Sequence, residues 1–173
     1  MFWLKSGLFA VGLGMSFVYA IIPPLARDLG LSEIQASFIF SLSAVAWAMT
    51  SAPWGRASDK YGRRNIAILG YIGYSISMII LILPIYLADK NILSAAFVFP
   101  LLILGRTIYG LLGSATRPAS FAYIADITPK SKRTKKFARF ESNFLLGTLV
   151  GPLLGGYLYC LLYTSDAADD RVS

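Results

Sequence analysis

Long stretches without a charged residue constrain this chain more than any other feature of its sequence. Four of them run for 21 to 24 residues, and a fifth is interrupted only by Arg106 and Arg117. About 20 helical residues cross the hydrocarbon core of a bilayer. The sequence therefore predicts an all-α membrane protein with five transmembrane helices, at about residues 6–26, 34–54, 65–88, 92–125 and from 142 to 159 or beyond.

The Lys and Arg residues outside these stretches favour one orientation. One side of the membrane would hold Lys5 and the segments 55–64 and 126–141, which together carry eleven Lys or Arg residues. The other side would hold 27–33 and 89–90, with two. Because short loops rich in Lys and Arg stay in the cytoplasm, we expect a cytoplasmic N-terminus. This rule also accounts for the net charge of +7, so the expected partner is the lipid bilayer and not nucleic acid.

The inventory of reactive side chains argues against an enzyme. The chain has no histidine and one cysteine, Cys160, which excludes histidine-based catalysis, histidine metal sites and an internal disulfide. No Asp or Glu lies within the first three predicted helices, so the carboxylates that hydrolysis or metal chemistry would need are missing there. We expect no catalytic residue, no metal site and no cofactor.

The composition changes abruptly after Tyr159. Residues 160–165 match what a common library-preparation transposon end encodes in one frame, and 166–170 fit the adapter bases that usually follow. We therefore expect 160–173 to be sequencing-adapter read-through, which is excluded from fold reasoning. The alternative is a genuine polar terminus. If it is read-through, the natural sequence breaks off within the fifth helix.

Between the second and third predicted helices lies the pattern Gly-x3-Asp-Lys-x-Gly-Arg-Arg, at residues 55–64. Glycine allows a tight turn, Asp59 can accept hydrogen bonds at a helix end, and Arg63 can fork onto a carboxylate. A generic basic loop is the alternative, but the spacing is more specific than that. It resembles motif A of the major facilitator superfamily. The resemblance implies a cytoplasmic gate made by Gly55, Asp59, Gly62, Arg63 and Arg64.

The fourth predicted helix carries two arginines on one stripe. Arg106, Gly110, Gly113 and Arg117 step by four, three and four residues, which keeps them on one helix face. A buried charge in a membrane is costly and marks a pathway by default, so we expect a polar cavity or a partner carboxylate. For Arg117, near the helix end, a snorkelling side chain is equally consistent. Arg106-x-x-Tyr109-Gly110 resembles motif B of the superfamily, which has Gln where Tyr109 stands, and implies a role in the cavity or in proton coupling.

The end of the fourth helix reads Ala-Tyr-Ile-Ala-Asp-Ile-Thr-Pro, at residues 122–129. Pro129 and the basic run that follows should end the helix. The segment resembles the same part of tetracycline-type drug efflux pumps, where this acid pairs with the motif A arginine. The resemblance implies that Asp126 contacts Arg63 and completes the gate. The alternative is a solvated helix cap without a partner.

The fifth helix contains Gly-x3-Gly-Pro-x2-Gly-Gly, formed by Gly147, Gly151, Pro152, Gly155 and Gly156. Three of the glycines share a face, and small residues let helix backbones approach closely. Pro152 should bend the helix. A plain packing face is the alternative, but the complete pattern resembles motif C, found in proton-coupled antiporters of the superfamily. We expect this face to seal one half of the transporter against the other.

The resemblance covers nearly all of residues 2–159 and identifies the chain as a member of the major facilitator superfamily, of the drug:proton antiporter type. It implies twelve helices in two halves, of which this chain would supply five of the first six and be inactive alone. The implied function is proton-coupled efflux of a small molecule or drug by alternating access, in the inner (plasma) membrane of a bacterium. The partners would be the substrate, the proton and the missing C-terminal half. The first helix lacks the acid that tetracycline-type pumps usually carry there. The alternatives are a sugar or metabolite transporter of the same superfamily, or a membrane anchor or interaction module without transport.

Overall fold

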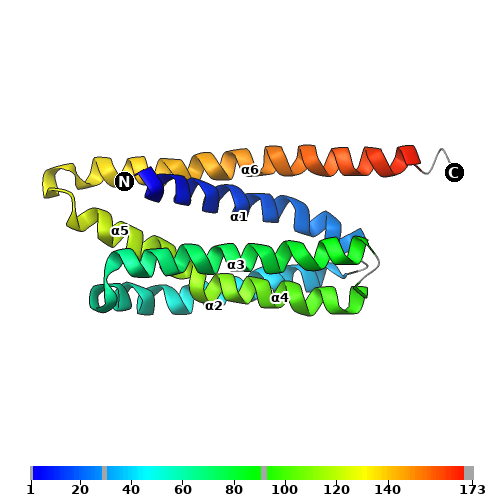
Figure 1. Cartoon of the computed structure of the whole chain (residues 1–173), viewed down its shortest axis with the longest axis horizontal. Helices are drawn as coiled ribbons and strands as arrows, with labels where there is room; N and C mark the ends of the chain where they lie inside the picture. The colour runs from blue at the N-terminus through cyan, green and yellow to red at the C-terminus, as the bar shows by residue number, and fades with distance from the viewer. Residues whose placement is uncertain (1, 29–30, 91–92, 170–173) are drawn as a thin grey trace. The chain divides into compact units, whose positions relative to one another are not determined.

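The computed structural model describes residues 2–28, 31–90 and 93–169, and within these ranges all regular structure is helical. This confirms the predicted all-α class. Six α-helices and two short 3-10 turns follow one another (Figure 1): α1 Phe2–Asp28, α2 Glu33–Tyr61, α3 Arg63–Asp89, α4 Ala95–Leu112, η1 Gly113–Ala115, α5 Thr116–Asp126, η2 Lys130–Lys132 and α6 Arg133–Asp169.

Four stretches of the described residues are long and apolar enough to cross a membrane: Leu4–Leu25, Glu33–Tyr61, Arg63–Ala88 and Phe97–Asp126. They overlap the first four predicted spans. The fifth predicted span falls on α6. The structure does not describe all of the side chains in that stretch, so this span stays a prediction. α6 continues to Asp169 through most of the segment predicted to be read-through, and 170–173 lie outside the described residues.

The chain divides into two compact units, one formed by residues 1–28 and 138–173 and the other by residues 29–137. In the first unit, α1 and α6 approach each other closely at glycines. In the second unit, α3 packs against α4 and α5, and α2 packs against α4. Each predicted site falls within one unit, so each is described there.

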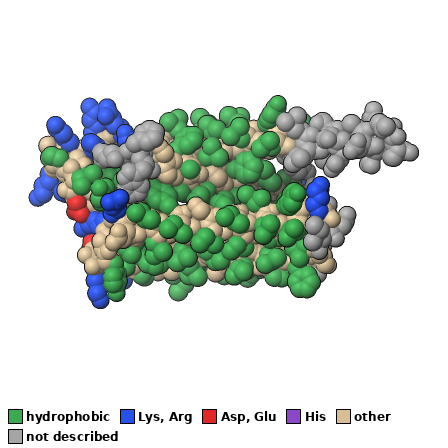
Figure 2. Space-filling view, viewed as in Figure 1, with side chains coloured by type: hydrophobic (Ala, Val, Ile, Leu, Met, Phe, Trp, Pro, Cys, Tyr) green, Lys and Arg blue, Asp and Glu red, His purple; other side chains and the backbone are tan. Residues whose placement is uncertain are grey.

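The outer side of α3 is apolar, as expected of a helix that faces lipid. Large apolar side chains at helical spacing are exposed along it: Ile68, Ile72, Ile76, Ile79 and Leu83. Figure 2 shows hydrophobic side chains over the flanks of the helices and Lys and Arg side chains mainly towards their ends. An exposed apolar surface of this extent is unusual in soluble monomers and marks a membrane contact.

The segment predicted as a loop between the second and third helices is almost entirely helical. α2 continues to Tyr61 and α3 begins at Arg63, so only Gly62 lies outside a helix. Its φ of +94° is in the region that glycine adopts at little cost and other residues rarely adopt. The prediction of a loop over 55–64 was therefore wrong in extent, because one glycine is enough to reverse the chain.

The fourth span is not one continuous α-helix. It is interrupted by η1, between α4 and α5. Pro118 explains the break, because proline has no N–H to donate to the carbonyl four residues earlier, at Ser114, and its ring crowds that carbonyl. The Thr50 hydroxyl of α2 lies 2.8 Å from the Ser114 hydroxyl and 2.9 Å from the carbonyl oxygen of Gly110. The predicted single stripe is therefore interrupted before it reaches Arg117.

Candidate functional site

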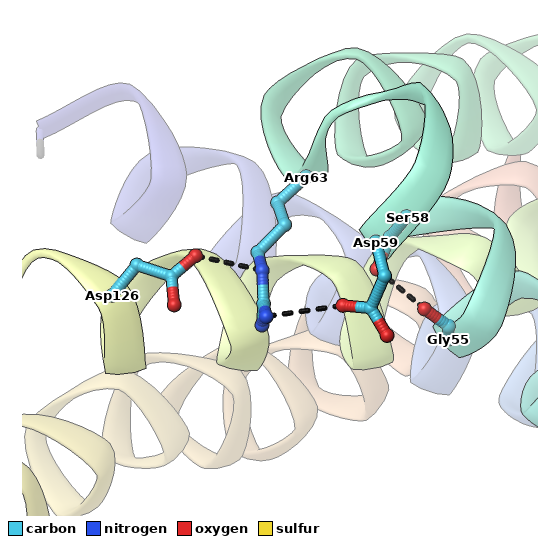
Figure 3. A network of polar contacts seen from close by, with 5 residues as sticks. All are labelled: Gly55, Ser58, Asp59, Arg63 and Asp126. Atoms are coloured by element: carbon cyan, nitrogen blue, oxygen red, sulfur yellow. Dashed lines mark hydrogen bonds and ion pairs between the residues drawn. The ribbon is translucent and has the colours of Figure 1, made fainter.

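Three helix ends meet at a cluster of charged side chains (Figure 3). Asp59 lies in the last turn of α2, Arg63 is the first residue of α3, and Asp126 is the last residue of α5. Arg63 Nε lies 2.7 Å from Asp126 Oδ2, and Arg63 Nη2 lies 3.0 Å from Asp59 Oδ1. One guanidinium thus bridges two carboxylates from different helices. The structure places Asp126 against Arg63, where the resemblance implied a pair.

The local sequence explains how these three side chains come together. The one-residue turn at Gly62 puts Arg63 four positions after Asp59, within reach of its carboxylate. Ser58 is buried, and its hydroxyl donates to the carbonyl of Gly55 at 2.7 Å. On the other side, α5 ends at Asp126 because Pro129 cannot extend it, which leaves the carboxylate at the helix end.

The cluster is partly open to solvent, which limits its strength. The exposed fraction of the side chain is 30% for Arg63, 63% for Asp59 and 53% for Asp126. Exposed ion pairs contribute about 0.2–1 kcal/mol each, so the two together stabilise this arrangement by about 0.5–2 kcal/mol. That is enough to change the ratio of two conformations by about 2-fold to 30-fold, and too little to lock the protein in one of them.

A cleft of about 660 Å³ opens at the charged cluster. Besides the three paired residues, it takes in Arg64 and Asn65 from the start of α3 and Tyr123 and Ile127 from the region where α5 ends. Of the predicted gate residues, Gly62 lines the cleft, whereas Gly55 lies within α2, where an added Cβ would lie 4.0 Å from Pro118 Cβ. Among the described residues, no group of His, Cys, Asp and Glu could hold a metal ion.

Arg106 lies apart from this cluster, inside the second unit. Its side chain is 1% exposed, and its guanidinium carbon lies 5.1 Å from the ring centre of Phe40 and 5.0 Å from that of Tyr109. Tyr74 meets the Tyr109 ring edge-on at 6.0 Å. In this structure Arg106 is therefore packed between aromatic rings, and its predicted role in a polar cavity or in proton coupling stays a prediction. Cation–π contact is a known way to hold a guanidinium away from water.

Phe40 is the residue of this site that sequence reasoning missed. It belongs to α2, 66 positions before Arg106, and nothing in the local pattern of α2 sets it apart from the other apolar residues there. Tyr109 was predicted, on the same helix as Arg106. Its aromatic ring, where the family pattern has an amide, is the signal that could have suggested an aromatic environment.

The two glycines of the predicted stripe have packing roles. A Cβ added at Gly110 would lie 2.7 Å from both Ala46 Cβ and the carbonyl oxygen of Ser43, so the glycine lets α4 approach α2. A Cβ at Gly113 would lie 2.7 Å from the Tyr109 ring. Arg117 is half-buried in α5, beyond the interruption at η1.

The glycine face of α6 packs on α1. A Cβ added at Gly147 would overlap the carbonyl oxygen of Phe9 and lie 2.7 Å from the backbone nitrogen of Leu13. One at Gly151 would overlap the Ser16 hydroxyl and lie 2.5 Å from the carbonyl oxygen of Leu13. The space in front of these two glycines is filled by α1 of the same unit, and their predicted role in sealing one half of a transporter against the other stays a prediction.

The remainder of the α6 pattern is looser. Around Gly155 the nearest atoms to an added Cβ are 3.4 Å away, and around Gly156 nothing lies within 4 Å. Pro152 is exposed, and Figure 1 draws α6 as one continuous helix through it. The close contact is thus confined to the first half of the motif.

Comparison with known proteins places these features in a family. The profile of the Major Facilitator Superfamily matches residues 6–164. The tetracycline resistance protein, class B, of Escherichia coli is 34% identical over 148 residues, which are 84% of this chain and 34% of that protein. The quinolone resistance protein NorA of Staphylococcus aureus is 26% identical over 157 residues, which are 91% of this chain and 37% of that protein. The chain spans about a third of the length of these relatives.

Both relatives come from bacteria, and the apolar helices make this chain a multi-pass membrane protein. The predicted location in a bacterial inner (plasma) membrane agrees with both findings. The family match covers most of the chain and spans the charged cluster, the arginine on α4 and the glycines of α6. The chain therefore belongs to the major facilitator superfamily and resembles its drug-resistance members.

Proposed function

We propose that the chain forms part of a secondary active transporter that exports a small molecule in exchange for protons. The family match and the two resistance proteins among its relatives support export of a drug-like substrate. The observation that carries the proposal is the arginine shared by two carboxylates, because it joins three helix ends through contacts weak enough to be broken in each transport cycle. Substrate crosses unchanged, so no chemical step is proposed.

The charged cluster acts as a gate at the cytoplasmic surface. Transporters of this architecture expose a central site to each side in turn by rocking two halves of the protein. While Arg63 bridges Asp59 and Asp126, the ends of α2, α3 and α5 stay together and one conformation is favoured. Protonating either carboxylate removes one pair and shifts the equilibrium by the differential free energy of that pair. In the complete protein, Asp59 can then cap a helix of the second half.

Arg106 supplies the charge within the membrane. A cation at that depth is expensive and marks a substrate or proton pathway, and no acid lies within residues 6–26, 34–54 or 65–88. We place a carboxylate of the second half, or an anionic group of the substrate, opposite Arg106 when the cavity is open. Phe40 and Tyr109 hold the guanidinium when the cavity is closed. Gly110 keeps α4 against α2, and Arg117 remains near the membrane surface.

The α1–α6 contact has a supporting role. With backbone at van der Waals distance at Gly147 and Gly151, the two helices can move as one body during rocking. Gly155 and Gly156 lie in the looser part of the same helix and leave room for a neighbour.

The test is to replace Asp126 by Asn in the complete transporter and to measure transport in inverted membrane vesicles. Tetracycline and a quinolone serve as probes, and a pH dye follows the protons. Asp126→Asn removes one of the two pairs, so we expect it to lower transport by about 1.4-fold to 5-fold and Asp126→Glu to retain most of it. Glu33→Gln, at the opposite end of α2, is the matched control and should transport normally. Unchanged transport in Asp126→Asn would refute the gate, and failure of every protein to move either probe would refute drug export.

A further inference from the structure

A run of basic side chains follows directly on the gate. Six of the ten residues from 130 to 139 are Lys or Arg, and no Asp or Glu lies between Ile127 and Phe140. Figure 2 shows Lys and Arg side chains gathered at this end. We call this run, residues 130–139, the basic corner. Four of its six cations are exposed and two are half-buried: Lys130, Lys132, Lys135 and Arg139, and Arg133 and Lys136.

The structure makes most of the basic corner helical. α6 begins at Arg133, nine residues before the predicted entry into the membrane at residue 142. At 1.5 Å per residue those nine residues span about 13 Å, whereas the headgroup layer on one side of a bilayer is roughly 5–8 Å thick. A straight continuation of α6 therefore carries these cations through the whole depth of the lipid headgroups.

The cations and the apolar residues of this segment point in different directions. Lys135, Lys136 and Arg139 lie within an arc of about 100° around α6. Phe140 is 1% exposed, and the Phe137 ring packs against Phe121 at 5.4 Å. The aromatic side anchors the segment to the protein and leaves the basic side outward. A basic face on a helix lying at this depth is typical of segments that bind anionic membranes.

The acids that flank the basic corner along the chain are Asp126 and Glu141, and Glu141 lies more than about 100° around α6 from Lys135, Lys136 and Arg139. The preceding acid along the chain, Asp126, pairs with Arg63, and the Nε of Arg133 donates to the carbonyl oxygen of Thr128 at 3.1 Å. The cations of α6 stand in its first two turns, with no acid in the first turn, and positive charges at that end of a helix are unfavourable. The preference of basic loops for the cytoplasm explains their number, but not why they are packed at one corner with these orientations.

We propose that the basic corner is a docking surface for the headgroups of anionic phospholipids. Lipid is favoured over nucleic acid or an acidic protein because the corner is continuous with a helix that enters the membrane and lies at headgroup depth. Each Lys or Arg near an anionic surface strengthens association about fivefold, so two of them account for roughly 25-fold. The docking surface does not depend on transport and goes beyond it, since it would exist in a protein with any substrate.

The test uses the full 173-residue chain in nanodiscs of phosphatidylcholine with one fifth phosphatidylglycerol. The chain carries Cys160→Ser and a donor dye on Ser131→Cys, and a trace of acceptor-labelled lipid is either phosphatidylglycerol or phosphatidylcholine. We expect at least twice the energy transfer to labelled phosphatidylglycerol in low salt, and loss of the difference in 0.5 M NaCl. The preference should survive 10 mM inorganic phosphate, which would abolish it if the corner were a site for a free ion.

Two double variants test the residues. Lys132→Gln with Lys135→Gln removes two of the six cations from the basic corner and should weaken the preference for phosphatidylglycerol. Lys5→Gln with Lys90→Gln removes the same charge elsewhere and should leave it intact. Equal circular dichroism spectra would show that both variants keep their helices. The proposal is overturned by equal transfer to the two lipids in the labelled chain that keeps all six cations, by an unchanged preference without Lys132 and Lys135, or by equal loss in both variants.

Discussion

The close approach of α1 and α6 predicts opposite effects of the same substitution at two glycines of one helix. At Gly147, a methyl group would meet the carbonyl oxygen of Phe9 and the backbone nitrogen of Leu13, 2.7 Å away. At Gly156, it would meet nothing within 4 Å. Both glycines lie in α6, so Gly147→Ala and Gly156→Ala differ in what surrounds the methyl group and little else.

The size of the effect follows from two terms. Replacing a helical glycine by alanine gains about 1 kcal/mol of helix propensity, and this gain is common to both variants. Overpacking costs about 1–3 kcal/mol, and Gly147 should lie at the upper end because the opposing atoms are backbone and cannot rotate away. We therefore expect Gly147→Ala to destabilise the α1–α6 contact by about 2 kcal/mol and Gly156→Ala to stabilise α6 by up to about 1 kcal/mol.

The assay is a titration of the detergent-solubilised chain with dodecyl sulfate. Energy transfer between dyes on Ala10→Cys in α1 and Leu149→Cys in α6, with Cys160→Ser, reports separation of the two helices. The midpoint for Gly147→Ala should fall below that of the parent chain, and the midpoint for Gly156→Ala should stay equal or rise. Equal midpoints for the two variants, or a lower one for Gly156→Ala, would refute the argument from backbone contact.

Two further predictions concern the other sites. Gly62→Ala should destabilise the second unit by about 1–2 kcal/mol, because a φ of +94° is unfavourable for alanine. Thermal unfolding of this variant, with Gly156→Ala as the control, measures the effect. An unchanged unfolding midpoint would contradict the one-residue turn. A double-mutant cycle of Phe40→Leu and Arg106→Met, measured by the same unfolding assay, should give a coupling free energy of about 0.5–2 kcal/mol from the ring contact. Additive effects of the two substitutions would mean that Phe40 does not hold Arg106.

Local features of the sequence were sufficient for much of the fold. The uncharged stretches located four spans that the structure also has, because crossing a bilayer imposes a length and a composition on each helix separately. Gly62 could be assigned to a tight turn, since only glycine suits the backbone there. The break at η1 also has a local cause, Pro118, but the spacing of arginines and glycines around it led to the prediction of one continuous helix.

Only part of the charged cluster could be predicted from neighbouring residues. Asp59 and Arg63 are neighbours along the chain, so their contact needs only the turn at Gly62. Asp126 is 63 positions beyond Arg63, and its place in the cluster was expected from the resemblance to efflux pumps, not from any rule of spacing. Whether the cluster gates transport stays a proposal, and the structure supplies the contact and its exposure.

The sequence by itself determined that the chain is helical, that it enters a membrane, and approximately where its first four apolar spans lie. Only the tertiary structure decided which helix faces which: that Phe40 lies on Arg106, and that α1 fills the space in front of Gly147 and Gly151. The physical reason is the solvent. In water, the buried face of a helix is its apolar face, but in lipid the outward face is apolar too, as it is along α3. Periodicity then no longer distinguishes inside from outside, and the pairing of helices rests on shape and on a few polar contacts between residues far apart in the chain.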